Sequence, residues 1–296
     1  MKVHLNGQLL DAAAARVSPF DRGFVFGDGL YEGLRAFDGV PFAMRLHIER
    51  LREGLRETRI EGFDPDSLAA RTDELLRANA LRDAFVYWQV TRGAPDVARA
   101  PTTQWRDRTA ASPLAPTVFG YAVPLPGLDA CAEPAARRIT LRPDLRWLRG
   151  HVKSISLMGS VLGAYEALDA GCDDAVYQRD GFVTEGVATN VVVRTGDALV
   201  TPGVEGGRLL GGVTRRVLLA ADPSIITRPV SVEELHGAQE VMLVGTSTMV
   251  AAATHIDGAP VGDATPGEAA RGLLRALVAA VRRDIAAAGA PVHSET

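Results

Sequence analysis

Tight two-residue turns recur along this chain, and they limit the folds open to it more than any other feature. They are expected at Asn6-Gly7, Asp38-Gly39, Asp180-Gly181, Gly196-Asp197 and Asp257-Gly258. Each dipeptide separates two short, largely apolar runs, which is the pattern of a β-hairpin. The sequence therefore predicts antiparallel sheet in both halves of the chain.

Segments with apolar residues at helical spacing lie between these turns. In residues 46–58, for example, Ile48, Leu51 and Leu55 fall on one helical face. We expect helices at residues 46–58, 64–81, 156–171 and 213–222, after the Ser231–Glu234 capping box, and from Pro266 onward. We expect further strands at residues 85–93, 117–123 and 137–141. The combination predicts the α+β class.

A connection rich in proline and glycine, PLPGLD, follows the strand expected at residues 117–123. Such a composition is typical of a boundary between domains. We expect a small N-terminal α+β domain over residues 1–121, a linker over 122–128 and a larger domain over 129–296.

Composition argues against several classes of partner. The formal net charge of −4 gives no broad attraction to nucleic acid or anionic lipid. No apolar run reaches the ~18 residues that a membrane span needs. The chain has two cysteines, Cys131 and Cys172, and its six histidines form no familiar ligand pair, so no metal site is expected. These features predict a cytoplasmic enzyme.

Lysine is scarce in this chain. Lysine and arginine together total 32 residues, but lysine occurs only at Lys2 and Lys153. Arginine can replace lysine in surface ion pairs, yet its guanidinium stays protonated and cannot serve as an amine nucleophile. Schiff-base chemistry requires an amine that can lose its proton. Lys153 is therefore either a surviving surface lysine or a reactive amine.

Several longer motifs occur in a fixed order: RWLRGHVKS, EALDAGCDDAVYQRDGFVTEGVATN, LLGGVTR, VGTST and HIDG. Together they resemble the fold-type IV pyridoxal-phosphate enzymes, from residue 2 to about residue 275. FGDGLYE, HIERL and YWQVTRG bring the resemblance nearest to the D-amino acid aminotransferases. It implies a two-domain enzyme with a smaller N-terminal α/β domain and a larger, β-rich pseudo-barrel domain. It also implies pyridoxal 5′-phosphate as cofactor, small amino acids and 2-oxo acids as substrates, and a homodimer.

The resemblance assigns two residues to the reacting part of the cofactor. Lys153 would form the Schiff base with the cofactor and later move a proton at the substrate. Glu185, in VTEG, would pair with the ring nitrogen, which favours the protonated ring. Asn190 matches a family position that either contacts the cofactor or hydrogen-bonds the local loop.

The resemblance also implies a set of residues around the cofactor's phosphate and ring. Arg50 would bind phosphate oxygens with its planar guanidinium. Val213 and Thr214 would donate backbone N–H groups from a helix N-terminus, with Gly211 and Gly212 allowing a close approach. Thr246 would add a hydroxyl and an amide, and Leu210 would pack on one ring face. For the glycine-rich turn, the alternative is a loop without a ligand.

Substrate recognition departs from the pattern of the resembling enzymes. Tyr31 matches a tyrosine that lines the substrate pocket, although it could instead pack in the core. The D-amino acid aminotransferases carry an Arg-x-His pair after VTRG, but this chain reads GAPDVARAPTT and has no histidine there. Arg22, Arg92 and Arg99 are the candidates to replace that pair as the carboxylate trap, and each could equally be a structural ion-pair partner.

Two further departures bear on specificity. Leu157 stands four residues after Lys153, where branched-chain aminotransferases usually have a tyrosine, and MVAAATHIDG makes one pocket wall smaller and more apolar. In contrast, YEGLRAF is closer to the branched-chain pattern. We expect transamination between a D-amino acid and a 2-oxo acid, with unusual carboxylate recognition and some activity on (R)-amines. The alternatives are a branched-chain L-amino acid aminotransferase, an aminodeoxychorismate lyase and a non-catalytic cofactor binder.

Overall fold

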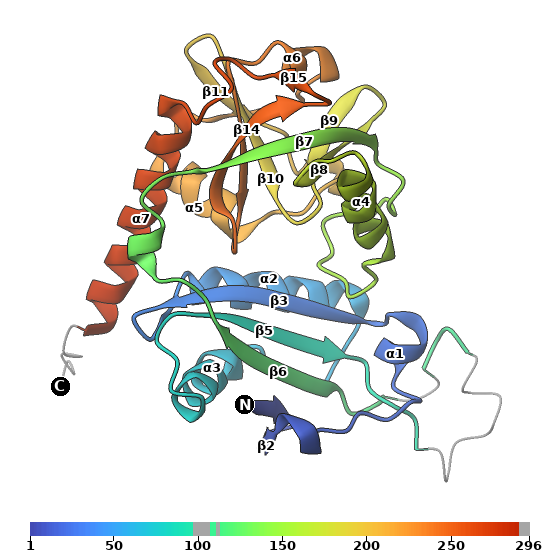
Figure 1. Ribbon diagram of the computed structural model, residues 1–296. Helices are drawn as coiled ribbons and strands as arrows, with labels where there is room; N and C mark the ends of the chain where they lie inside the picture. The colour runs from blue at the N-terminus through green and yellow to red at the C-terminus, as the bar shows by residue number, and fades with distance from the viewer. Residues whose placement is uncertain (97–106, 111–112, 290–296) are drawn as a thin grey trace. The chain divides into compact units, whose positions relative to one another are not determined.

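The computed structural model describes residues 1–96, 107–110 and 113–289 (Figure 1). The chain divides into two compact units. The first unit comprises Met1–Pro126 and Val152–Ser156, and the second comprises Gly127–His151 and Leu157–Thr296. A five-residue segment from the stretch expected in the C-terminal domain therefore packs with the first unit.

The first unit is built on an antiparallel sheet with strand order β2-β1-β6-β5-β3-β4. Its strands are β1 (Lys2–Leu5), β2 (Gln8–Asp11), β3 (Gly29–Phe37), β4 (Val40–Pro41), β5 (Ala84–Thr91) and β6 (Thr117–Pro124). Its helices are α1 (Arg22–Phe26), α2 (Met44–Thr58) and α3 (Ser67–Ala78), with a 3-10 turn at Ala12–Ala14.

Side chains alternate between the two faces of this sheet, as strand geometry requires. Leu30, Leu34 and Trp88 are buried in one core with apolar residues of α2 and α3, such as Leu51 and Leu75. The intervening positions face the other way and carry a row of tyrosines. The helix-covered face is therefore the core, and the opposite face is aromatic and only partly buried.

The second unit contains a larger mixed sheet with strand order β12-β11-β10-β13-β14-β7-β8-β9, and β15 pairs with β14. Its strands are β7 (Ala135–Pro143), β8 (Asp174–Arg179), β9 (Phe182–Gly186), β10 (Asn190–Thr195), β11 (Ala198–Thr201), β12 (Ile226–Thr227), β13 (Glu240–Gly245), β14 (Met249–Ile256) and β15 (Ala259–Pro260). Its helices are α4 (Met158–Asp169), α5 (Val213–Ala221), α6 (Val232–His236) and α7 (Glu268–Gly289), with 3-10 turns at Leu128–Ala130 and Glu205–Gly207.

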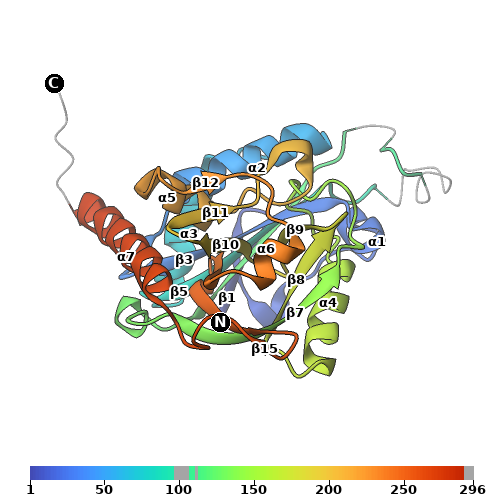
Figure 2. The ribbon, with the colours of Figure 1, turned by 90° about the horizontal axis from the view of Figure 1, so that it is seen from above.

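Helices α5 and α7 pack on each other and on strands β13 and β14, whereas α4 packs on β7 and β8, the two parallel strands that it connects (Figures 1 and 2). Apolar residues of the sheet, including Val191, Val241 and Leu243, form the buried core of the second unit together with Leu235 of α6. No helix among the described residues is both long and apolar enough to cross a membrane.

The α+β prediction is confirmed, and each predicted turn joins two paired strands. At the first of them, Asn6 and Gly7 both have positive φ, as the expected turn type requires. The Ser231–Glu234 cap is also present, since the Ser231 side chain accepts from the Glu234 N–H.

The helix boundaries differ from the prediction by one to three residues, most clearly at α3 and α7, and one helix, α1, was not predicted. Helix α3 begins at Ser67 because Asp64 binds the Asp66 N–H and the Ser67 hydroxyl in a turn, and the chain leaves the helix before Ala80, whose φ is 53°. Helix α7 begins after Pro266, where the Glu240 carboxylate accepts from two first-turn N–H groups. Helix α1 is started by Asp21, which accepts from the Gly23 N–H.

Candidate functional site

The backbone of Lys153 is fixed against the start of β3. The Tyr31 N–H donates to the Lys153 carbonyl over 3.1 Å, and the Ile155 N–H donates to the Gly29 carbonyl over 3.1 Å. Between them, Leu30 and Ser154 form an isolated antiparallel bridge. The segment Val152–Ser156 is thus held as a short extra strand of the first unit, which fixes where the Lys153 side chain begins.

The Lys153 amine lies against an aromatic row. Its Nζ is 4.2 Å from the centre of the Tyr31 ring, within the range of a cation–π contact. Tyr31 stacks on Tyr87 at 5.6 Å, and Tyr87 stacks on Tyr121 at 5.1 Å. Burial raises the pKa of Tyr87, so this ring stays a neutral phenol. Lys153 is half-buried beside rings that hold one another in place.

Glu32, His47 and Arg50 form a buried cluster on the helix-covered face of the same unit. Arg50 donates to both carboxylate oxygens of Glu32, over 2.8 and 2.7 Å, and His47 Nδ1 lies 2.6 Å from Glu32 Oε2. Burial alone would raise the pKa of Glu32, but Arg50 and His47 hold it at about 2. Burial lowers the pKa of His47, and Lys153 is among the charges that add to this effect. Glu32 is therefore ionised and His47 neutral at pH 7.

In the second unit, Glu185 is surrounded by donors. The carboxylate stands near the end of β9 and is buried. The Leu210 N–H donates to its Oε2 over 2.9 Å, the Asn190 amide lies 3.4 Å from the same oxygen, and Arg146 Nη1 lies 2.9 Å from Oε1. Asn190 also donates to the Leu210 carbonyl over 2.9 Å. Of the predicted site residues, Glu185, Asn190 and Leu210 are therefore directly bonded to one another.

The loop after Leu210 leads into α5. The first helical backbone bond here runs from the Arg216 N–H to the Gly212 carbonyl, so the helix itself does not use the N–H groups of Val213 and Thr214. A side chain at Gly212 would collide with Asn190, whereas one at Gly211 would meet no atom within 4 Å. The turn thus offers two amides at a helix N-terminus beside open space, a donor set that suits a phosphate.

Thr246 directly follows β13 and is half-buried. Strand β13 pairs with β10 in a register that sets Val244 opposite Asn190. Thr246 therefore lies at the strand end where β10 begins, in the same unit as α5.

Two of the three candidate substrate arginines share one carboxylate. Arg22 and Arg92 each donate from Nε to Asp28 Oδ2 over 2.8 Å. Arg22 also donates to the carbonyls of residues 107 and 108, and Arg92 to those of residues 58 and 59. These bonds hold the buried Arg22 side chain and the half-buried Arg92 side chain in place without a substrate. The third candidate, Arg99, lies outside the described residues.

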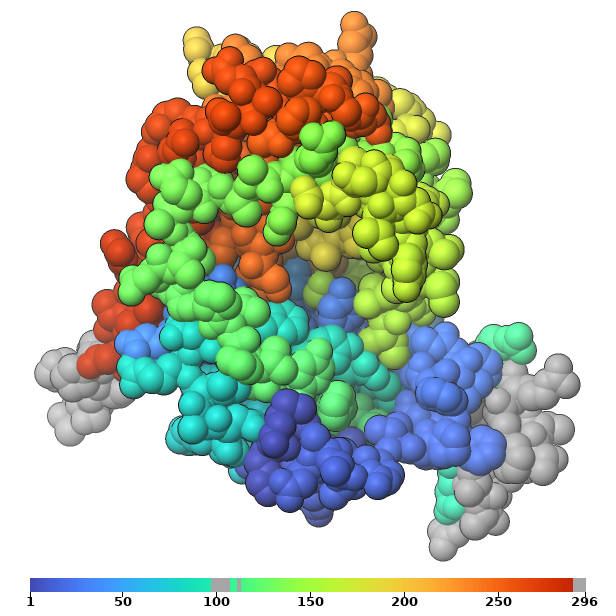
Figure 3. All heavy atoms as spheres, in the orientation of Figure 1, coloured from blue at the N-terminus to red at the C-terminus, as the bar shows by residue number. Residues whose placement is uncertain are grey.

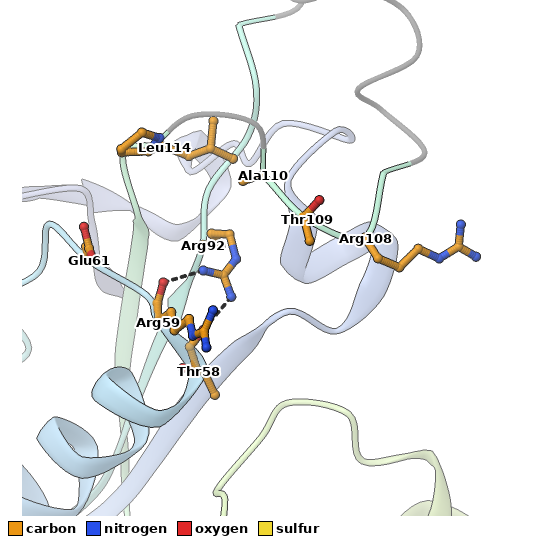
Figure 4. A pocket seen from close by; sticks show the side chains of 9 residues that line it. Thr58, Arg59, Glu61, Arg92, Arg108, Thr109, Ala110 and Leu114 are labelled. Atoms are coloured by element: carbon orange, nitrogen blue, oxygen red, sulfur yellow. Dashed lines mark hydrogen bonds between the residues drawn. The ribbon is translucent and has the colours of Figure 1, made fainter.

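Arg92 lines a cavity of about 380 Å³ in the first unit (Figure 4). Other charged residues in its lining are Arg59, Glu61 and Arg108, so arginine outnumbers acid. Arg92 directly follows β5, and Thr91 pairs with Gly29, the residue that binds the Ile155 N–H. Arg92 therefore stands at the end of β5 that pairs with the start of β3, to which the Lys153 segment is bonded.

Among the polar residues of these clusters that sequence reasoning missed are Glu32, His47 and Arg146. Glu32 shares a strand phase with Leu30 and Leu34, and a lone acid at a core-facing position is a signal for a buried partner. His47 and Arg50 stand three residues apart on α2, which places them on one face. Arg146 carries no comparable signal for its contact with Glu185, because Glu185 and Tyr177 lie on strands more than thirty residues further along the chain.

A model of the family described as "Amino-transferase class IV" matches residues 29–256. A D-alanine aminotransferase of Bacillus licheniformis is 34% identical over 282 residues, covering 94% of this chain and 96% of its own length. A protein of Methanocaldococcus jannaschii, named provisionally as a branched-chain-amino-acid aminotransferase, is 35% identical over 277 residues, covering 90% and 92%. A hypothetical aminotransferase from Mycobacterium tuberculosis, solved in its PLP-bound form, matches with a TM-score of 0.78 at 21% identity, covering 96% of this chain and 100% of its own. This last likeness confirms the predicted fold.

Proposed function

We propose a specific function from one established premise: this chain belongs to the class IV aminotransferase family. As a member, it is an aminotransferase that uses pyridoxal 5′-phosphate. Within that family we propose that it moves the amino group between a D-amino acid and a 2-oxo acid. D-Alanine and D-glutamate are the proposed donors, and (R)-amines are proposed as secondary substrates.

The position of Lys153 is the observation that carries the amino-transfer chemistry of this proposal. It is one of only two lysines in the chain, its backbone is bonded to β3, and its amine is half-buried against Tyr31. The other lysine, Lys2, has a side chain that is 45% exposed and is paired with Asp11. When bound, the cofactor supplies an aldehyde for the amine and a ring that takes up electrons from the substrate. Lys153 would bind that aldehyde and then move a proton at the substrate's Cα.

Glu185 would act on the ring nitrogen as a fixed anion. Its three donors keep the carboxylate oriented, and hydrogen bonds to a carboxylate favour its charged form. Asn190 would then orient Glu185 and the Leu210 loop together, which unites the two roles expected for it. Leu210 would provide both this backbone bond and an apolar surface for the ring.

The phosphate would lie at the N-terminus of α5. Val213 and Thr214 offer amides there, the helix dipole favours an anion, and Gly211 leaves room. Thr246, in the same unit, would add its hydroxyl. Arg50 is proposed as the cationic partner of the phosphate, and its bidentate bond to Glu32 would hold the guanidinium plane in one orientation.

For the substrate carboxylate we propose Arg92 ahead of Arg22 and Arg99. Arg92 lines the cavity at the strand end near the Lys153 segment, and together with Arg22 it brings two positive charges to one negative charge on Asp28. Arg22 is more deeply buried and holds the carbonyls of residues 107 and 108. Tyr31 would form the neighbouring wall of the substrate site.

A branched-chain L-amino acid aminotransferase is the second candidate. The Methanocaldococcus jannaschii relative bears that name, and the YEGLRAF segment of β3 resembles that pattern. Leu157 counts against it, because the tyrosine expected of branched-chain enzymes is missing at this position. The D-alanine aminotransferase relative of similar identity favours the first candidate.

A half-reaction distinguishes the two candidates. Purified protein loaded with cofactor is mixed separately with D-alanine, L-alanine and L-leucine, and the visible absorption band of the cofactor is followed. We expect D-alanine alone to bleach the band towards the amine form. Bleaching by L-leucine or L-alanine alone would overturn the D-amino acid assignment. Pyruvate release from aminodeoxychorismate without a 2-oxo acid would identify a lyase instead.

We also propose that the chain forms a homodimer through an apolar surface on α4. Its exposed residues are Met158, Val161, Leu162, Tyr165 and Leu168, and the adjoining loop exposes Leu145, Trp147 and Leu148. In the space-filling view, the yellow-green atoms of α4 lie at the surface of the second unit (Figure 3). Monomeric proteins rarely expose so continuous an apolar patch, and the interfaces of permanent homodimers are apolar. A second copy of this chain is therefore the proposed occupant.

The dimer predicts a change in mass when a charge enters this surface. Leu162→Glu should yield a monomer, because burying the carboxylate at the interface is costly. Ile226→Glu is the matched control, since Ile226 is a similarly exposed apolar residue on β12. Light scattering after size-exclusion chromatography measures the mass. A wild-type monomer, or a dimeric Leu162→Glu variant, would contradict this proposal.

A further inference from the structure

A row of four alternating charges is buried in the second unit beside the proposed cofactor residues. Arg146 lies 2.9 Å from Glu185 on one side and binds Asp144 with two hydrogen bonds of 2.9 and 3.0 Å on the other. Arg179 Nη2 lies 3.2 Å from Asp144 Oδ1, which is one of the two oxygens that Arg146 binds. Each of the four side chains is at most 15% exposed. The order is Glu185, Arg146, Asp144, Arg179, so the formal charges cancel.

Arg146 is fixed in both position and charge. Its guanidinium lies over the Tyr177 ring, 4.3 Å from the ring centre. Asp144, its bidentate partner, also accepts from the Thr184 hydroxyl over 2.8 Å. Burial would raise the pKa of Asp144, but Arg146, Thr184 and Arg179 lower it, so Asp144 stays ionised. Arg146 therefore cannot swing away from Glu185 without breaking several buried interactions.

A fixed cation beside Glu185 changes how strongly its carboxylate can attract another positive charge. A carboxylate that already shares its charge with a guanidinium attracts a second cation less strongly than an unpaired one does. If Glu185 faces the ring nitrogen, as proposed above, the protonated ring brings a positive charge to a cluster that is already neutral. Without Arg146 the same cluster would carry one negative charge, which the ring proton would balance.

We propose that Arg146 is a positioning residue that limits the strength of the bond between Glu185 and the protonated ring nitrogen of the cofactor. This inference rests on the proposed role of Glu185. Arg146 acts through the Glu185 carboxylate and does not itself touch the ring. It sets how firmly the ring holds its proton, and hence how strongly the ring withdraws electrons from the substrate.

The test compares two cofactors that differ only at the ring nitrogen. Dissociation constants are measured for pyridoxal 5′-phosphate and for 1-deazapyridoxal 5′-phosphate, in which a C–H group replaces the nitrogen. In Arg146→Gln we expect the preference for the natural cofactor to rise about tenfold over wild type, equivalent to one pKa unit. Arg146→Lys, which keeps the charge, should stay near the wild-type preference.

Arg179→Gln is the matched control, because Arg179 binds Asp144 but has no bond to Glu185 among the described contacts. In Arg179→Gln the preference for pyridoxal 5′-phosphate over its 1-deaza analogue should change less than about twofold, well under the equivalent of one pKa unit. If both cofactors weaken equally in Arg146→Gln, or if Arg179→Gln raises the preference as much, the proposal is overturned. Arg146→Met provides a second neutral variant, and thermal unfolding of each apoprotein identifies any that fails to fold.

Failure of this inference is distinguishable from failure of the proposed function. A wild-type protein that binds both cofactors equally would remove the role of Glu185, and this inference with it, while leaving Lys153 as the attachment point. A wild-type protein that binds neither cofactor would remove the proposed function itself. A raised preference in Arg146→Gln alone supports the inference.

Discussion

The charge states of the buried groups near Lys153 are determined by the residues in direct contact with them. Glu32 remains ionised because Arg50 and His47 surround it, although burial opposes the charge. His47 remains neutral because burial outweighs the attraction of Glu32, and Arg50 and Lys153 repel a further positive charge. The result is a permanent ion pair, Glu32–Arg50, with a neutral histidine beside it.

This cluster predicts the response of stability to acid. The pKa of Glu32 is about 2 in the folded chain against an ordinary 4.5, so its stabilisation is complete above pH 4.5 and disappears as the pH falls towards 2. The lowered pKa of His47 acts in the same direction below its ordinary 6.5. Glu32→Gln should lower the free energy of unfolding at pH 7 by ~3–5 kcal/mol, because Arg50 loses its buried partner. It should also flatten the acid branch between pH 4.5 and 2.

Denaturant unfolding at a series of pH values measures both effects. Glu268→Gln is the control, because Glu268 forms an exposed ion pair with Arg275, and exposed pairs contribute only ~0–1 kcal/mol. A Glu32→Gln variant as stable as this control would mean that the cluster does not stabilise the folded chain.

At the scale of elements, local signals predicted the hairpins and most helices, and long-range contacts decided the rest. The turn at Asn6-Gly7 needs only two residues with positive φ, which the sequence names directly. The start of α7 depends on Glu240, almost thirty residues earlier in the chain, so no local pattern reveals it. Arg146 is similar, since its partners Glu185 and Tyr177 belong to strands further along the chain.

The candidate site divides in the same way. Lys153 and Glu185 lie in ordered motifs, so the resemblance proposes them as site residues, and hydrogen bonds join Glu185, Asn190 and Leu210. The Glu32–Arg50 ion pair joins a strand to a helix, and sequence reasoning found only its arginine. Arginine side chains are long and reach many acceptors, so the sequence left the carboxylate partner open.

The space around two helical glycines predicts opposite effects of alanine, because Gly163 of α4 is in close contact with β8 and Gly272 of α7 is not. An alanine methyl group at Gly163 would collide with the Tyr177 hydroxyl, so Gly163→Ala should destabilise the chain by ~1–3 kcal/mol. At Gly272 in α7 the nearest atom would be Arg275 Nη2 at 3.9 Å, so Gly272→Ala should stabilise it by ~0.5–1 kcal/mol. Thermal unfolding of both variants measures whether each substitution raises or lowers the unfolding temperature relative to wild type. A Gly163→Ala variant as stable as wild type would show that packing at Gly163 is not tight, and a destabilised Gly272→Ala variant would contradict the prediction for α7.

At the scale of the whole molecule, the chain passes between its two units at residues 126–127, 151–152 and 156–157. Lys153, Tyr31 and Arg50 consequently belong to the first unit, whereas Glu185 and the α5 N-terminus belong to the second. Five residues in the middle of the sequence thus bring the lysine to a sheet formed by the N-terminal part. A boundary drawn from composition alone does not reveal this return of the chain.

Attachment of the cofactor to Lys153 is the central claim, and chemical reduction tests it most directly. Protein loaded with pyridoxal 5′-phosphate is treated with borohydride, digested and examined by mass spectrometry. Lys2 and the N-terminal amine serve as internal controls, because they are the other amines of the chain. We expect a phosphopyridoxyl group on Lys153 and none in Lys153→Ala. A label confined to Lys2 or the N-terminus, or one that persists in Lys153→Ala, would contradict the claim.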